Sequence, residues 1–312
     1  MHIQTTGLEC YDVVEHPAHP DKPVDQDSTI SAPSALPTQP PDRVTRRPRR
    51  LKPSLAVAAL VASGLLLILP YHAVARTGAL HQRPFIVVLD PGHGGSDPGA
   101  VDASGKLMEK DLTLQVAQRT EVDLRGMGYR VYLTRTRDQG VNTPPRDLNH
   151  DGHIDHVDEL DARNLFANRH HADVIVSIHF DAIGDPSIHG THGYYCPARP
   201  FWRQSERLAN LLTAAVASSL AHAHYSSPDN GVQTDVDDNV PQTRPDYPWF
   251  LILGPSLRHF VTGTNMPGAL IESLFLSSPR DAAALGHSSI IAAIAQGYAD
   301  GIRGYFGGRA RQ

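Results

Sequence analysis

Short apolar runs are the clearest hydrophobic pattern in the chain. The first of them, Phe85–Leu89, is continuous, which is typical of a strand buried on both faces of a parallel sheet rather than of a half-exposed strand. Comparable runs follow at 128–134, 172–178 and 268–271. We predict a strand at each of these positions, and a shorter one at 193–195.

Stretches with apolar residues at helical spacing separate these strands. Ser278 and Pro279 open the last stretch, with Asp281 as the acid of a capping box. The predicted helices cover 109–127, 161–171, 201–223 and 279–306. This alternation predicts one α/β domain over residues 84–308, with a sheet flanked by helices. The polar segment 224–266 is predicted as an irregular insert with a strand near 249–253.

The residues before this domain have a different character. Residues 1–53 are polar, rich in proline and basic at their end, which predicts a disordered tail. Residues 54–75 carry no charge, and their length is close to the roughly 20 residues that a bilayer crossing needs. The preceding basic residues predict a cytoplasmic tail and an exported domain, joined by a linker at 76–83. We expect an uncleaved anchor that holds the protein in the cell envelope; cleavage after Ala75 and secretion are the alternative.

The composition mainly argues against certain partners and certain kinds of site. A net charge of −5 with 20% charged residues argues against nucleic acid as the partner. The two cysteines, Cys10 and Cys196, fall on opposite sides of the predicted anchor, so neither a disulfide framework nor a cysteine-based zinc site is expected. Cys196 follows a short strand and is interpreted as a packing residue rather than a nucleophile.

Four side chains suited to metal chemistry fall at the ends of predicted elements. His93 follows the first strand in a glycine-rich turn, His179 follows the third, and Glu272 follows the last. Glu109 opens the helix after the first strand. Because the carboxyl ends of parallel strands meet at one sheet edge, we expect these side chains to lie close together. Two histidines and one glutamate are a common catalytic zinc set, and the second carboxylate would take a proton from the attacking water.

Several motifs around these residues occur together in one known family. They are DPGHGG at 90–95, EKD at 109–111, LTR at 133–135, Arg163 with AN at 167–168, SIHFDA at 177–182 and NMPGALIE at 265–272. With these motifs in order over nearly all of 84–306, the chain resembles the zinc-dependent N-acetylmuramoyl-L-alanine amidases of the amidase-3 type. The resemblance implies a twisted, mostly parallel six-stranded sheet flanked by helices. It implies His93, Glu109 and His179 as zinc ligands and Glu272 as the catalytic glutamate.

The activity implied by this resemblance is hydrolysis of peptidoglycan at the amide between N-acetylmuramic acid and the L-alanine of the stem peptide. Two residues depart from the family pattern: Asp181 stands where Asn is usual, and Leu274 where Gly is usual. Leu274 is expected beside the catalytic carboxylate, where its bulk would affect substrate fit. Two other functions stay open: a carboxypeptidase-like zinc hydrolase of another amide, and a non-catalytic wall-binding module. The sequence names no activating partner.

A second candidate metal site is the loop 147–158. Oxygen-bearing side chains at positions 1, 3, 5, 9 and 12, with glycine at position 6, give the spacing of an EF-hand, and the final Asp resembles the dockerin version. The predicted calcium ligands are Asp147, Asn149, Asp151, the backbone carbonyl of His153, Asp155 and Asp158. The carboxylates repel one another unless a cation or solvent screens them, so a solvated acidic loop is the alternative.

Overall fold

The computed structural model describes residues 83–236 and 247–307. The predicted disordered tail, the predicted membrane segment and all but the last residue of the linker lie outside these ranges. Within the described ranges, no helix is both long and apolar enough to cross a membrane.

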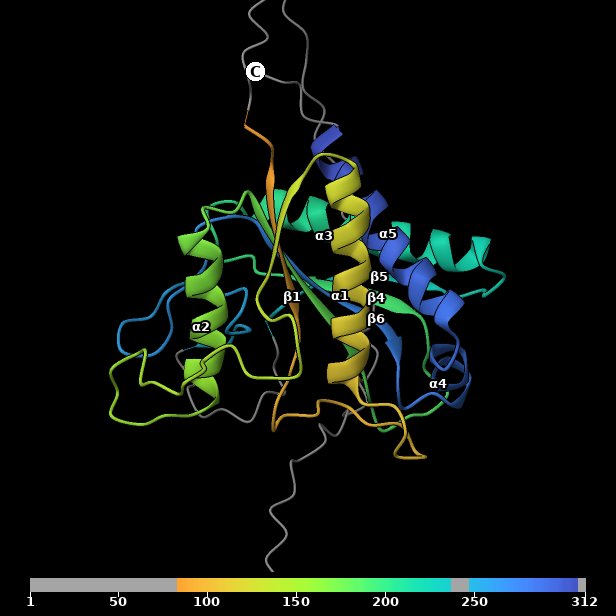
Figure 1. The fold of residues 1–312 in the computed structure, drawn as a ribbon, viewed down its shortest axis with the longest axis horizontal. Coiled ribbons are helices and arrows are strands. Elements are labelled where there is room, and N and C mark those ends of the chain that lie inside the picture. The colour runs from red at the N-terminus through yellow and green to blue at the C-terminus, as the bar shows by residue number, and fades with distance from the viewer. Residues whose placement is uncertain (1–82, 237–246, 308–312) are drawn as a thin grey trace, which may run out of the picture. The chain divides into compact units, whose positions relative to one another are not determined.

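Six strands of the described residues form a single sheet with the spatial order β2-β1-β3-β6-β4-β5 (Figure 1). All neighbouring strands are parallel except β4, which runs antiparallel to β6. The strands are β1 (Ile86–Pro91), β2 (Arg130–Leu133), β3 (Val174–Asp181), β4 (Thr191–Tyr195), β5 (Asp229–Thr234) and β6 (Gly268–Phe275). The predicted α/β class and the mostly parallel six-stranded sheet are therefore confirmed.

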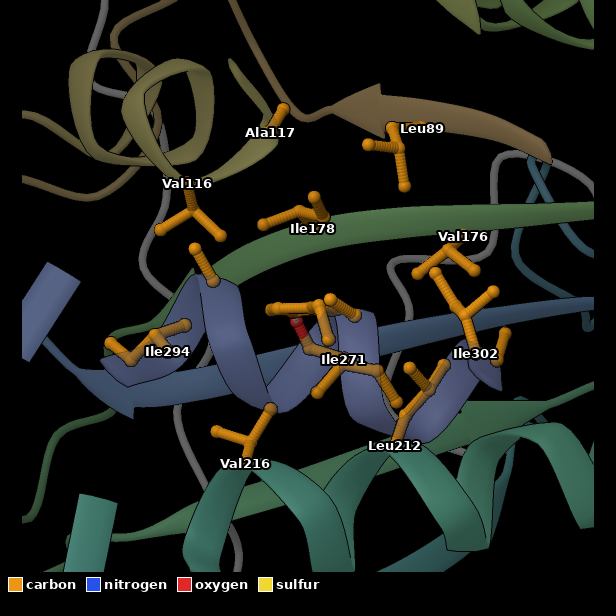
Figure 2. Close-up of a cluster of buried hydrophobic side chains, with 14 of the residues drawn as sticks. Leu89, Val116, Ala117, Val176, Ile178, Leu212, Val216, Ile271, Ile294 and Ile302 are labelled. Carbon is orange, nitrogen blue, oxygen red and sulfur yellow. Dashed lines mark hydrogen bonds between the residues drawn. The ribbon is translucent and has the colours of Figure 1, made fainter. Parts of the chain in front are cut away.

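Helices cover both faces of this sheet. Within the described ranges they are α1 (Glu109–Gly126), α2 (His156–Arg169), α3 (Trp202–His222), α4 (Pro279–Leu285) and α5 (Ser288–Gly307). Helices α1 and α3 both pack against α5, and Figure 1 shows α2 standing apart from this group. The larger buried cluster lies between the sheet and helices α1, α3 and α5. Figure 2 shows its side chains meeting, among them Val116 of α1, Val216 of α3 and Ile294 of α5.

Alternation along the strands decides which face carries the polar residues. In β3, Val176 and Ile178 belong to the larger cluster, whereas Ile175 belongs to a second cluster on the opposite face. Because successive side chains of a strand point to opposite faces, Ser177 and His179 share the face of Ile175. The polar residues near the carboxyl ends of the strands thus lie on the face away from α1, α3 and α5.

Helix α2 begins at His156 rather than at the predicted Asp161. The carboxylate of Asp155 accepts a hydrogen bond from the backbone N–H of Val157 at 2.8 Å, and that of Asp158 accepts one from the N–H of Asp155 at 3.0 Å. This capping box places negative charge at the positive end of the helix dipole. The helix therefore starts inside the predicted calcium loop 147–158.

The strand predictions were too short at the site and wrong in the insert. His179 and Glu272 lie inside β3 and β6 rather than after them. The segment 224–266, predicted as irregular, contains β5, whose polar and largely exposed residues give no hydrophobic pattern. Residues 249–253 form turns, not a strand. Their apolar side chains pack into the second cluster, so they are buried without strand geometry.

The predicted closing helix is interrupted after Leu285, which gives the separate helices α4 and α5. Ser278 does precede the first helical residue, but Asp281 does not complete a capping box with it. The Asp281 carboxylate instead accepts hydrogen bonds from the backbone N–H groups of Gly190 and Phe275, at 3.1 and 3.0 Å. Asp281 was predicted from its local spacing to cap the helix, but its carboxylate makes tertiary hydrogen bonds instead.

Candidate active site

The turn after β1 brings His93 towards β3. The backbone N–H of Gly92 donates to the carbonyl of Ile178 at 3.0 Å. A Cβ atom on Gly92 would lie only 2.3 Å from Cε1 of His179, so a side chain at this position would collide with the His179 ring. His93 itself has a left-handed backbone with φ 61°, which costs of order 1 kcal/mol in a residue with a side chain. Such a turn is held in place by contacts outside it.

Two buried arginines supply these contacts. Arg163 donates to the backbone carbonyl of Pro91 at 2.8 Å and to that of His93 at 2.7 Å, and it pairs with Asp90 at 2.9 Å. Arg135 donates to the carbonyl of Pro91 at 3.0 Å and to that of Gly92 at 2.8 Å. Both arginines stand in the motifs on which the family resemblance rests, but no role could be predicted for them. Their role is to fix the carbonyl groups of the ligand-bearing turn.

His93, Glu109 and His179 converge as predicted. Nε2 of His93 lies 3.1 Å from Oε2 of Glu109, and Nδ1 of His179 lies 2.9 Å from Oε1 of the same carboxylate. One potential ligand atom of each residue lies within 4.8 Å of the others, and in the described part of the chain this is the group of three with that property. On its far side, Nδ1 of His93 contacts Oδ2 of Asp97 at 2.8 Å, which leaves Nε2 directed at Glu109. Asp97 was not among the predicted site residues, although it lies only four positions after His93.

Glu109 is the first residue of α1 and is 3% exposed. Its carboxylate accepts hydrogen bonds from the backbone N–H groups of Ala100 at 2.8 Å and Phe180 at 3.0 Å. Burial acts to raise the pKa of Glu109, but hydrogen bonds with His179 and His93 outweigh it and hold that pKa far below its usual range. Burial likewise acts to lower the pKa of His93, yet the carboxylates of Asp97 and Glu109 raise it to about 9.

This donor set fits a zinc ion. An ionised carboxylate held between two imidazoles is a place where a divalent cation can replace protons, and His₂Glu is a common catalytic zinc set. The packing also fits, because a Cβ atom on Gly99 would lie 2.5 Å from Oε2 of Glu109 and 2.6 Å from Cδ2 of His93. The backbone therefore closes tightly around the side chains of Glu109 and His93.

Glu272 lies beside this group without joining it. In the β3–β6 pairing it is directly opposite His179. Its Oε2 atom is buried, and none of the described residues donates a hydrogen bond to it. Burial first, and then the negative charges of Asp181 and Glu109, raise the pKa of Glu272 well above its ordinary value. A carboxyl group with a raised pKa and an unpartnered oxygen beside a metal-binding trio is suited to accept and return a proton.

The comparisons agree with this geometry. Residues 87–304 match the amidase-3 family, described as N-acetylmuramoyl-L-alanine amidase. The chain belongs to this amidase family. The N-acetylmuramoyl-L-alanine amidase AmiC of Neisseria meningitidis is 30% identical over 254 residues, which cover 72% of this chain and 53% of that protein. The germination-specific N-acetylmuramoyl-L-alanine amidase of Bacillus subtilis is 32% identical over 225 residues, covering 71% of this chain and 79% of that protein.

Solved structures of amidases are similar as well. The catalytic domain of CwlV, an N-acetylmuramoyl-L-alanine amidase from Bacillus (Paenibacillus) polymyxa, matches with a TM-score of 0.52 and 27% identity, covering 72% of this chain and 99% of that chain. The family and enzyme class predicted from the sequence are therefore confirmed. The chain spans about half the length of the Neisseria amidase.

One departure from the amidase pattern has a different consequence from the one expected. The register between β3 and β6 shifts after the His179–Glu272 pair, so that Asp181 is opposite Phe275. This bulge turns Leu274 away from the face of Glu272 and into the larger core cluster, where it is fully buried. The expectation that Leu274 lies beside the catalytic glutamate was therefore wrong.

The predicted calcium loop of the amidase folds largely on its own hydrogen bonds. The Asp147 carboxylate accepts from the backbone N–H groups of Asp151 and Gly152, at 3.2 and 3.0 Å. Asp158 is fully buried, and its carboxylate accepts from the N–H of Leu148 at 2.6 Å besides capping α2. Unlike His93, Glu109 and His179, the acidic residues of this loop form no three-residue metal group within the described ranges.

Proposed function

We propose that this amidase hydrolyses the peptidoglycan amide between N-acetylmuramic acid and the L-alanine of the stem peptide. We assign a zinc ion to His93, Glu109 and His179, and the role of proton acceptor to Glu272. The observation that carries the proposal is the unpartnered, buried Oε2 of Glu272 next to a His–Glu–His trio. Bound zinc would supply an activated water molecule and a positive charge facing the developing negative charge on the carbonyl oxygen.

The chain's own residues would then do the following work. Glu272 accepts a proton from the attacking water as the new C–O bond forms. It delivers that proton to the L-alanine nitrogen as the C–N bond breaks. Asp97 holds the ring of His93 in the tautomer that leaves Nε2 for the metal. Arg135 and Arg163 keep the turn that carries His93 in position.

The test uses variants that separate metal binding from catalysis. Glu272→Ala removes the base but leaves the trio intact, so it should retain zinc and lower hydrolysis on the order of 10²–10⁴-fold. His93→Ala and His179→Ala should lose zinc. Metal analysis and peptide release from purified peptidoglycan are measured on the same preparations. Full zinc retention in both histidine variants, or near-normal turnover in Glu272→Ala, would show that the roles are misassigned.

Two alternatives keep parts of this reading. A carboxypeptidase-like hydrolase would share the zinc site but cleave elsewhere in the stem peptide. A non-catalytic wall-binding module would need neither Glu272 nor the metal trio, and their joint presence in one sheet region argues against it. Family membership favours the amidase over both.

For residues outside the described ranges, we propose that 54–75 anchors the protein in the cytoplasmic membrane with residues 1–53 inside the cell. The proposal is supported by the uncharged stretch, the basic residues before it and the cell-wall substrate expected of the family. Cleavage after Ala75, with secretion, remains the competing proposal.

We also propose that the loop 147–158 binds calcium weakly. Support comes first from its EF-hand spacing. In addition, hydrogen bonds within the loop hold two of the predicted ligand side chains in position: Asn149 Oδ1 accepts from the N–H of Asp151 at 3.0 Å, and Asp147 accepts from the N–H of Gly152. The capping role of Asp158 competes with metal binding and is one reason to expect low affinity.

A further inference from the structure

A histidine that the proposed mechanism does not use lies on the other side of Glu272. In the sheet, Glu272 of β6 is paired with His179 of β3 on one side and with His192 of β4 on the other. Directly opposite residues on neighbouring strands point to the same face, with Cβ atoms about 5 Å apart. His179, Glu272 and His192 therefore form one row across three strands, with the carboxylate between the two imidazoles.

His192 is held in a defined position. It is 5% exposed, and its ring stacks on Phe275 with a centroid distance of 5.3 Å. Its Nε2 atom lies 3.3 Å from Oδ2 of Asp181 and 3.2 Å from the hydroxyl oxygen of Tyr194. None of the described residues forms a hydrogen bond with its Nδ1 atom. Such a fixed ring with one unused nitrogen is more than core packing requires, because Phe would stack on Phe275 equally well.

The ring is neutral under ordinary conditions. Burial lowers the pKa of His192 to about 4, so its contact with Asp181 is made by a neutral imidazole and is not an ion pair. Nε2 faces the side-chain oxygens of Asp181 and Tyr194, both of which can accept a hydrogen bond, so the tautomer with the proton on Nε2 satisfies these contacts. Nδ1 is then a hydrogen-bond acceptor.

The order of His179, Glu272 and His192 across the three strands indicates which part of the substrate would contact His192. The metal trio lies on the β1–β3 side of Glu272, so the scissile carbonyl belongs on that side. The nitrogen that receives the proton from Glu272 must lie near Glu272, and the peptide that follows it extends towards β4. His192 is the residue of β4 directly beside Glu272.

We propose that His192 is a catalytic residue on the leaving-group side, whose Nδ1 accepts a hydrogen bond from the N–H of the scissile amide. The proposal rests on the proposed amidase function. No covalent bond to His192 is made or broken. The hydrogen bond orients the L-alanine nitrogen, the water proton passes through Glu272 to that nitrogen, and the C–N bond breaks with its electron pair on nitrogen.

The test compares two soluble substrates that differ in one atom. The first is a muramyl peptide with the natural amide. The second is the matching depsipeptide, in which oxygen replaces the L-alanine nitrogen and removes the N–H. His192→Phe should lower kcat/KM for the amide about tenfold, the loss typical of one hydrogen bond, and leave kcat/KM for the ester unchanged. His192→Gln, whose side-chain oxygen still accepts, should recover part of the amide activity.

Two further measurements separate this role from structural damage. Zinc content should equal that of the wild type in both His192 variants. In a Glu272→Gln background, which prevents turnover, His192→Phe should weaken binding of the amide substrate and not of the ester. The matched control is His170→Phe. His170 stacks on Tyr132 at the end of α2, so this variant should leave kcat/KM unchanged for both substrates.

Equal losses on amide and ester would overturn the proposal, because damage to the fold or to the metal site affects both. Unchanged kcat/KM for the amide in His192→Phe would overturn it as well. A wild-type enzyme that cleaves neither substrate at the muramyl–alanine bond would contradict the proposed function itself, and this role of His192 with it.

Discussion

Removing the Arg163 side chain should damage stability and the metal site together. Arg163 and Asp90 form an ion pair at 2.9 Å with side-chain exposures of only 2% and 1%. Breaking a buried pair from one side leaves the other charge without a partner, which typically destabilises by about 3–5 kcal/mol. Folded domains are stable by only about 5–15 kcal/mol, so Arg163→Met should lose a large fraction of the free energy of unfolding. The same guanidinium holds the carbonyl of His93, so zinc affinity should fall too.

The matched control is an exposed pair of similar geometry. Arg83 meets Asp173 at 2.8 Å, but the arginine side chain is 61% exposed. Exposed pairs contribute about 0–1 kcal/mol, so Arg83→Met should change the free energy of unfolding little. Both variants are compared with the wild type by urea unfolding of the zinc-loaded protein and by zinc titration. If Arg163→Met is no less stable than Arg83→Met, the reasoning about the buried pair is wrong.

The pH dependence gives an independent check on the same variant. Burial acts to raise the pKa of Asp90, but the charge of Arg163 and the hydroxyls of Thr134 and Ser177 outweigh it and lower that pKa. A carboxyl group with a lowered folded-state pKa stabilises the fold above its unfolded pKa of about 3.9 and loses that contribution as the pH falls through the folded value. The stability gap between wild type and Arg163→Met should therefore narrow in acid. A gap that is constant from neutral pH to about pH 3 would contradict this assignment.

Two other predictions concern the proposals outside the zinc site. Millimolar calcium should raise the melting temperature of the zinc-loaded protein, by an amount that corresponds to about 2.7 kcal/mol at 100 times the dissociation constant, and Asp151→Ala should abolish the shift. No shift in the wild type, or the same shift in both proteins, leaves only a solvated loop. Reporter fusions at positions 40 and 80 should read cytoplasmic and exported, respectively; a soluble mature protein that begins at Arg76 would establish cleavage instead.

The meeting of the candidate site residues could be predicted because most of their positions follow from parallel-sheet geometry. Apolar runs located β1, β3 and β6, and the residues near their carboxyl ends had to meet at one edge of the sheet. That logic brought His93, His179 and Glu272 together, although two of them lie inside their strands rather than after them. Residue types alone did not decide which glutamate binds metal; the geometry favours Glu109, which contacts both histidines.

The remaining features of the fold and of the site depend on tertiary contacts, which the spacing of residues along the chain does not predict. The bulge after Glu272 moved Leu274 into the core, and no residue in that segment signals it. His192 lies opposite Glu272 because β4 pairs with β6, and these two segments are far apart in the chain. A short strand could be predicted at 193–195, but no residue there indicates which strand lies beside it. Strand β5 was missed because an exposed polar edge strand has no hydrophobic pattern.

The measurement that tests the central claim most directly is a mass-spectrometric analysis of the products released from purified peptidoglycan by the zinc-loaded enzyme. Cleavage between N-acetylmuramic acid and L-alanine predicts free stem peptides that begin with an unblocked alanine, together with glycan strands that have lost those peptides. Glu272→Ala should release neither. Peptides shortened from their carboxyl ends, with the muramyl–alanine bond intact, would contradict the amidase assignment.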